Sequence, residues 1–220
     1  DYFIDSFGAV ANVGPGSPTG VTFGYGAKFP TKYQDAFFIN DWSFGKLRAV
    51  HLTPAGASYT GEGEDFVSGQ PLPVTDVVIN PHDGAMYFAV GGRNTQSGLY
   101  RVAYAGREST TPGQADTQFQ AQRDLRRRLE SFHGHTDAKA VETAWPYLSD
   151  PDRAIRFAAR IAVEWQDAAQ WREKALTEKE ARKAIAALVA LARVSGKDEF
   201  HGRAPAPKPD PALQARMQAA

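Results

Sequence analysis

The chain has 220 residues, 25 basic and 25 acidic side chains, and a formal net charge of zero. A neutral chain lacks the field that attracts nucleic acid or an anionic membrane surface, so neither is expected as a partner, and no apolar run approaches the ~20 residues of a membrane span. Cysteine is absent, which excludes disulfides, thiol catalysis and a Cys-x-x-Cys-His haem attachment within these residues.

Composition changes once along the chain. Up to about residue 105, short runs of Val, Phe, Tyr and Thr are broken by Gly, Pro, Asn and Asp, which predicts β-strands joined by turns. From about residue 117, Gly nearly vanishes and Ala, Arg, Glu and Leu dominate, which predicts helices. We therefore expect a β domain at residues 1–108, a linker at 109–117, a helical domain at 118–196, and a Pro/Ala-rich spacer with the start of a further segment at 197–220.

Two stretches of the β half resemble each other. Val21 and Val74 occupy matching places, as do Arg48 and Arg101, at an offset of 53 residues in both cases. Tandem copies of three or four short strands are typical of propeller blades. The first half is therefore predicted to be a partial β-propeller, the C-terminal blades of a larger ring, with about two blades and the remnant of a third. A β-sandwich is the alternative.

The second half is predicted to form a HEAT-like array of helices. The segment "SDPDRAIRFAARIAVEW" carries a narrow apolar stripe of Ile and Ala, with Asp150 as the expected N-cap and Pro151 at the first helical position. Thr177 and Glu180 have the spacing of a capping box before the next helix. Small Ala-rich contacts favour stacked antiparallel helix pairs. A short helical bundle is the alternative.

The best candidate for a binding site is the loop "GGRNTQ". Arg93, Asn94 and Gln96 place a guanidinium beside two amides, a set that suits a carboxylate-bearing ligand or a polyol. The two preceding glycines would let the backbone approach a ligand closely. A surface loop with solvated polar tips would have the same composition.

Three further residues are candidates for cofactor or substrate binding. Asp76 lies near the start of an expected inner strand, where a carboxylate could orient a hydroxyl or fasten two β units together. Asp41 and Trp42 occupy the equivalent loop of the preceding unit, and an indole beside a carboxylate suits a sugar. Packing of Trp42 between the β units is the structural alternative. No catalytic residue is assigned.

The sequence offers no metal site. The acidic run "GEGED" could recruit calcium from a turn, but its spacing fits no EF-hand loop, and solvated loop charges explain it better. The five histidines show no ligand spacing, and His51, on a strand, is expected to be exposed.

The chain nonetheless resembles a known family. "GSPTGVTFGYGAKFPTKYQDAFFINDWSFGKLRAVHL" followed by "PLPVTDVVINPHDGAMYFAVGGRNTQSGLYRVAY" is similar to the last blades of quinoprotein glucose/sorbosone dehydrogenase-like propellers. "AWPYLSDPDRAIRFAARIAVE" is similar to the HEAT-like segment that follows such propellers in large secreted haem-binding proteins of planctomycetes and verrucomicrobia. The resemblance extends from about Gly16 to Val194.

The resemblance implies a periplasmic or secreted sugar or polyol dehydrogenase. Such proteins hold pyrroloquinoline quinone and calcium and pass electrons to a c-type haem on a cytochrome domain, which would lie outside this chain together with the histidine base. We expect the chain to be a fragment, inactive by itself, of such an oxidoreductase. The alternative is a non-catalytic scaffold that binds protein or glycan partners.

Overall fold

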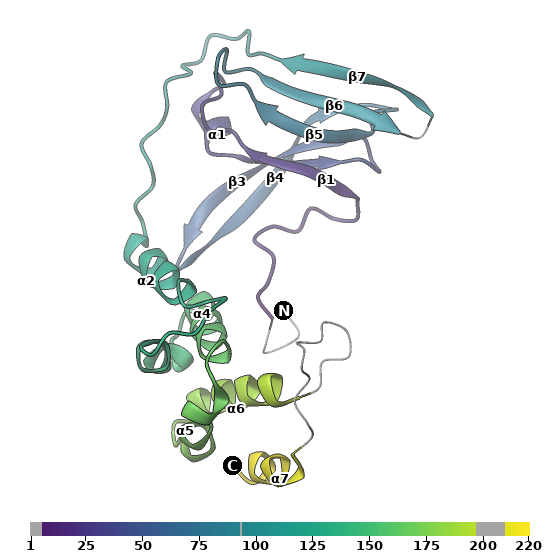
Figure 1. The fold of residues 1–220 in the computed structure, drawn as a ribbon. Helices are drawn as coiled ribbons and strands as arrows, with labels where there is room; N and C mark the ends of the chain where they lie inside the picture. The colour runs from purple at the N-terminus through teal and green to yellow at the C-terminus, as the bar shows by residue number, and fades with distance from the viewer. Residues whose placement is uncertain (1–5, 93, 197–209) are drawn as a thin grey trace. The chain divides into compact units, whose positions relative to one another are not determined.

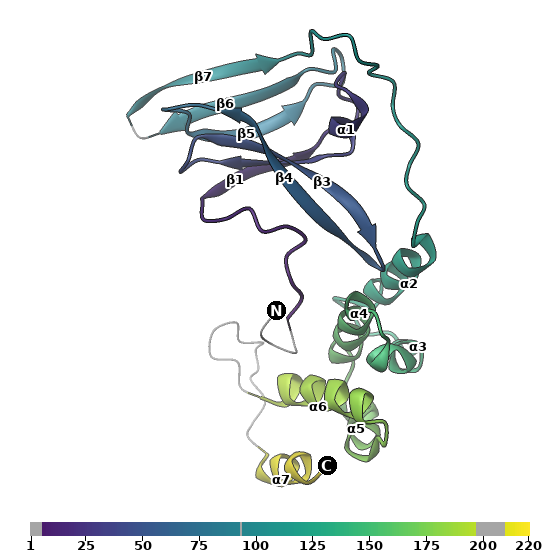
Figure 2. The same ribbon diagram turned by 180° about the vertical axis from the view of Figure 1, so that it is seen from behind.

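The computed structural model describes residues 6–92, 94–196 and 210–220. The chain divides into two compact units, which are coloured along the sequence in Figure 1 and seen from behind in Figure 2. The β unit comprises residues 9–55 and 59–118, and the helical unit comprises residues 1–8, 56–58 and 119–220. Each unit has a hydrophobic core of its own.

The β unit contains two antiparallel sheets. The first has the strand order β1-β2-β3-β4 and the second the order β5-β6-β7 (Figure 1). The strands are β1 (Pro18–Phe23), β2 (Phe37–Asp41), β3 (Lys46–Ala55), β4 (Ser58–Ser68), β5 (Val74–Ile79), β6 (Met86–Gly92) and β7 (Thr95–Val102), and one helical turn, α1 (Thr31–Gln34), precedes β2.

The two sheets share one core. Phe38 and Leu47 from the first sheet and Met86 and Phe88 from the second belong to the same buried cluster. Alternation of side chains along each strand turns these residues inward, so each sheet buries one face. Gly20 permits the sheets to approach, because a Cβ at this position would lie 2.9 Å from the Cα of Asp76.

The prediction of propeller blades is wrong. The described strands form two small open sheets, one of four strands and one of three, and neither sheet closes. The matching stretches do each form three antiparallel strands, but β3 continues into a fourth strand whereas β7 is the last strand of its sheet. A repeated strand pattern predicts similar local pairing; it does not specify a ring.

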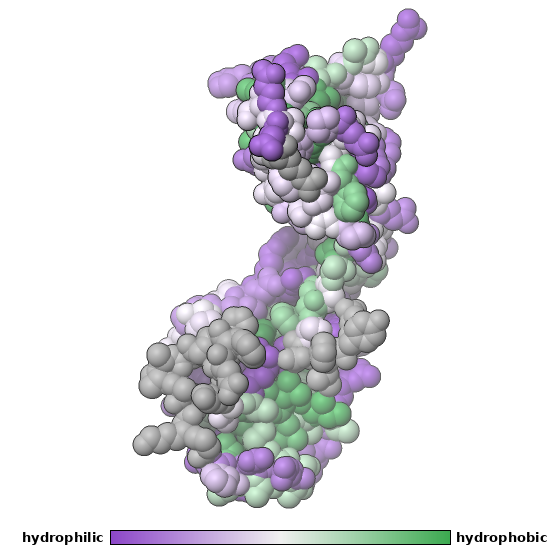
Figure 3. All heavy atoms as spheres, turned by 90° about the vertical axis from the view of Figure 1, so that its right-hand side faces the viewer, coloured by the Kyte–Doolittle hydropathy of each residue, from purple (hydrophilic) through white to green (hydrophobic). Residues whose placement is uncertain are grey.

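The helical unit packs short helices of unequal length around one core. Its elements are α2 (Gln120–Glu130), α3 (Ala140–Ala144), the 3₁₀ turn η1 (Trp145–Ser149), α4 (Arg153–Glu164), the 3₁₀ turn η2 (Ala168–Gln170), α5 (Arg172–Thr177), α6 (Ala181–Ser195) and α7 (Pro211–Ala219). In the lower part of Figure 3, which holds the helices, hydrophobic side chains gather beside hydrophilic ones. Leu129, Leu148, Trp171 and Leu191 are completely buried in this core.

The prediction of a HEAT array is also wrong. α3 has only five residues and passes directly into a 3₁₀ turn that carries Pro146, so no long antiparallel helix pair forms there. The expected stripe on α4 is buried, but its N-cap is Asp152, whose side chain accepts from the N–H of Ala154. Asp150 instead accepts from the N–H of Asp152. Glu180 is the N-cap of α6 and makes no side-chain capping bond, so the predicted capping box is absent.

None of the helices in the described ranges has both the length and the apolar character needed to cross a lipid bilayer.

Candidate functional site

A cavity of about 530 Å³ lies within the β unit, between α1 and the strands β3 and β4. We call it the His51 cavity. Most of its lining residues carry a polar side chain; they are Thr31, Lys32, Asp35, His51, Leu52, Glu62, Gly63 and Glu64. A volume of this size falls within the range of small-ligand sites.

Local structure explains how these side chains meet. On β4, Glu62 and Glu64 are two residues apart, so strand alternation directs both carboxylates to one side of the sheet. Gln34 anchors α1 to neighbouring loops, because its Nε2 donates to the carbonyls of Phe29 and Thr110, each at 2.8 Å. α1 meets the strands at Lys32, whose carbonyl oxygen lies 3.0 Å from Nδ1 of His51 on β3 and whose Nζ lies 3.1 Å from Oε1 of Glu64 on β4.

His51 is bound through both ring nitrogens. Nδ1 lies 3.0 Å from the carbonyl oxygen of Lys32, and Nε2 lies 2.8 Å from Oε1 of Glu64. Both neighbours are hydrogen-bond acceptors, so both bonds form together only when the ring carries two protons. The backbone carbonyl of Lys32 and the carboxylate of Glu64 together fix the orientation of the ring.

The same contacts control the ionisation of Glu64. Hydrogen bonds from His51 and then from Lys32, whose Nζ lies 3.1 Å from Oε1, lower the pKa of Glu64 to about 2. The pKa of Lys32 is raised by its interactions with Tyr33 and Glu64. The charged forms of Glu64 and Lys32 therefore support each other across the cavity.

Two other carboxylates of the cavity are not engaged. The side chains of Asp35 and Glu62 form no hydrogen bond or ion pair with any residue that the structure describes, and both residues are exposed. The cavity thus offers two acceptor groups to solvent beside the ammonium of Lys32 and the ring of His51. The three carboxylates of the cavity outnumber its basic side chains, Lys32 and His51, so the cavity has a net negative charge.

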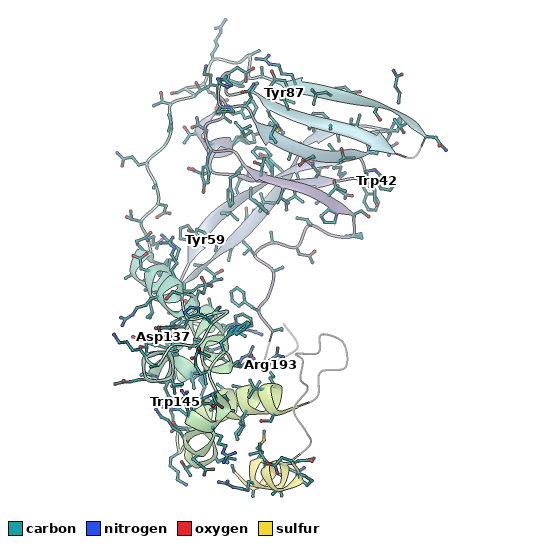
Figure 4. All side chains as sticks on the ribbon, viewed as in Figure 1. Trp42, Tyr59, Tyr87, Asp137, Trp145 and Arg193 are labelled. Carbon is teal, nitrogen blue, oxygen red and sulfur yellow. The ribbon has the colours of Figure 1, made fainter. Side chains whose placement is uncertain are left out.

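The residues predicted from sequence lie elsewhere. Asp41 is buried at the end of β2, and its Oδ1 accepts from the backbone N–H groups of Ser17, Ser43 and Phe44. These three bonds define a turn, so Asp41 has a structural role. Trp42 donates through Nε1 to the carbonyl of Gly91 at 2.9 Å (Figure 4).

The predicted loop is only partly described. Arg93 lies outside the described residues. Asn94 has a left-handed backbone (φ 56°) and is exposed, and Gln96 is exposed on β7. Asp76 is exposed on β5, and its Oδ1 accepts from the N–H of Val77. The structure joins Trp42 to the start of this loop, but none of the five described candidates lines the His51 cavity, and of these five only Trp42 lines the smaller cavity described next.

A second, smaller cavity of about 230 Å³ lies next to Trp42. Its other lining residues belong to two turns, Ser43–Gly45 and Gly69–Pro73. It contains no charged side chain, so it offers less to a polar ligand than the His51 cavity.

Sequence reasoning missed the His51 cavity. The segment "GEGED" was expected to be a turn, but it lies within β4. An available signal was the alternation of Gly and Glu, which in a strand places both glutamates on one side. The approach of α1 to these residues had no signal in the local pattern, because it depends on contacts between distant segments.

The described residues do not fit calcium and a carboxylate-bearing quinone. No group of three or more His, Asp or Glu side chains in the described ranges could hold a metal ion. Asp41 is committed to backbone N–H groups, and the negative charge of the His51 cavity disfavours an anionic cofactor. No step of a reaction is therefore assigned to these groups.

Comparison of the chain with protein-family models, with curated proteins and with solved structures gave no match.

Proposed function

We propose that the β unit is a binding module for a sugar or polyol, which occupies the His51 cavity. The observation that carries the proposal is the pair of unengaged carboxylates, Asp35 and Glu62, which face the same cavity as the ammonium of Lys32 and the fixed ring of His51. Each carboxylate can accept from two hydroxyl groups, and the ammonium can donate to a ring or hydroxyl oxygen. A neutral ligand with several hydroxyls uses both kinds of group without adding charge to the cavity.

Dehydrogenation of such a ligand is the activity that the family resemblance implies, and it stays a prediction. His51 is not assigned as the base for it, because both of its ring nitrogens already meet acceptors. Binding without turnover is the function that the described residues support best.

The proposal is tested by titrating the ¹⁵N-labelled chain with D-glucose, sorbitol and glycerol and following the backbone amide signals. We expect saturable shifts at residues 31–35, 51–52 and 62–64. Asp35→Asn and Glu62→Gln should each weaken binding about 3- to 10-fold, because a hydrogen bond to a charged acceptor is lost at a solvent-exposed site.

Asp65→Asn is the matched control. Asp65 follows Glu64 on β4, does not line the cavity, and pairs with Lys46 at 2.6 Å. This variant should bind like the native chain. Absence of saturable shifts with every compound, or equal weakening by all three variants, would contradict the proposal.

A further inference from the structure

A stacked pair of aromatic side chains lies exposed at the end of β1. The ring centroids of Phe23 and Tyr25 are 5.0 Å apart and the ring planes differ by 6°. Tyr25 is 64% exposed and Phe23 is 37% exposed. One face of the Tyr25 ring rests on Phe23, so its other face is available to a ligand.

The strand register connects this pair to the His51 cavity. Phe23 lies opposite Phe37 in the β1–β2 ladder, and the N–H of Gly24 donates to the carbonyl of Ala36 at 3.0 Å. Ala36 directly follows Asp35, which lines the cavity, and a Cβ at Gly24 would lie 1.9 Å from the carbonyl oxygen of Tyr33 on α1, so the turn that carries Tyr25 lies against the helix that borders the cavity. Partial burial and then the nearby charge of Asp35 raise the pKa of Tyr25, in agreement with this proximity.

We infer that Phe23 and Tyr25 form a second subsite, which binds the next ring of a linked saccharide whose first ring occupies the His51 cavity. The inference rests on the proposed function and names its ligand as an oligosaccharide. The electron-rich face of an aromatic ring attracts the C–H groups on the apolar face of a pyranose. Asp35, which lines the cavity and precedes the Ala36 that bonds Gly24, can accept from hydroxyl groups on either ring.

The geometry favours a sugar over a quaternary ammonium ligand. Such cations are recognised by aromatic rings that enclose the charge. Phe23 and Tyr25 are parallel and present one flat surface, which matches a flat ring. Choline therefore serves as a competing probe.

The experiment compares the dissociation constants of glucose with those of cellobiose and maltose, measured by amide-signal titration of the full chain. At least one disaccharide should bind on the order of tenfold more tightly than glucose, the gain expected from one added aromatic contact. Tyr25→Ala should abolish the gain and leave the affinity for glucose unchanged. Tyr25→Phe should keep it, because stacking does not need the hydroxyl.

Leu99→Ala is the matched control, since Leu99 is the most exposed large apolar side chain of the β unit (72%) and lies on β7. It should change neither affinity. If glucose binds but neither disaccharide binds more tightly, or if Tyr25→Ala weakens glucose and disaccharide equally, the second subsite is refuted while the proposed function stands. If choline shifts the Tyr25 signals and the disaccharides do not, the site is a cation site and the inference is wrong. If no sugar binds, both proposals fail.

Discussion

Replacing Glu64 by Gln tests whether the charges of the His51 cavity stabilise the β unit. Glu64 accepts from His51 at 2.8 Å and from Lys32 at 3.1 Å, and its pKa falls from 4.5 to about 2. A pKa shift of this size corresponds to a difference of about 3 kcal/mol between the interactions of the ionised and the protonated carboxyl group with the fold. The side chains of Glu64 and Lys32 are 42% and 57% exposed, so solvent screening reduces the expected contribution to about 1–2 kcal/mol.

The sign of the pH dependence follows from the lowered pKa. A carboxyl group whose pKa is lower in the folded state stabilises that state above its unfolded pKa, and this stabilisation is lost as the pH falls through its folded pKa. Glu64→Gln should therefore lower the free energy of unfolding by about 1–2 kcal/mol at pH 6. The difference from the native chain should shrink below pH 4.5 and disappear near pH 2.

Trp42 provides the assay. It is the one tryptophan of the β unit, since Trp145, Trp165 and Trp171 belong to the helical unit, so its indole N–H signal reports on unfolding of the β unit alone. The signal is followed during urea titrations at pH 6, 4 and 2. Glu62→Gln, which removes an unpaired carboxylate two residues away, should change stability by no more than about 0.5 kcal/mol. A native–variant difference that stays constant from pH 6 to pH 2, or none at pH 6, would refute the reasoning.

Three further substitutions test the packing of the two units. Phe38→Ala should destabilise the β unit by about 3–5 kcal/mol in the same assay, because the side chain is fully buried and a cavity replaces it. Gly45→Ala should cost about 1–3 kcal/mol, since Gly45 has a φ of 63° and its Cβ would lie 2.4 Å from the carbonyl oxygen of Gly69. Glu164→Ala should cost the helical unit about 3–5 kcal/mol, measured by its tryptophan signals, because it removes a buried ion pair with the guanidinium of Arg160. Changes below about 1 kcal/mol would show that these contacts do not support the fold as described.

The sequence by itself determined the local structure. Alternating apolar residues and turn residues predicted strands in the first half, and the Ala-rich periodicity predicted helices in the second. The apolar stripe of α4 was also visible, although the capping residue shifted from Asp150 to Asp152. These features depend on residues within a few positions of one another.

Only the tertiary structure decided how the strands and helices assemble and where the candidate site lies. The matching strand patterns could not distinguish propeller blades from two open sheets on a shared core, because strand alternation specifies which side chains face inward and not which sheet they meet. The His51 cavity joins three segments that are distant in sequence. The side chain of Asp41, a predicted binding residue, instead accepts hydrogen bonds from backbone N–H groups. A side chain becomes available to a ligand only when the fold leaves its polar atoms without other partners, and that condition depends on long-range contacts.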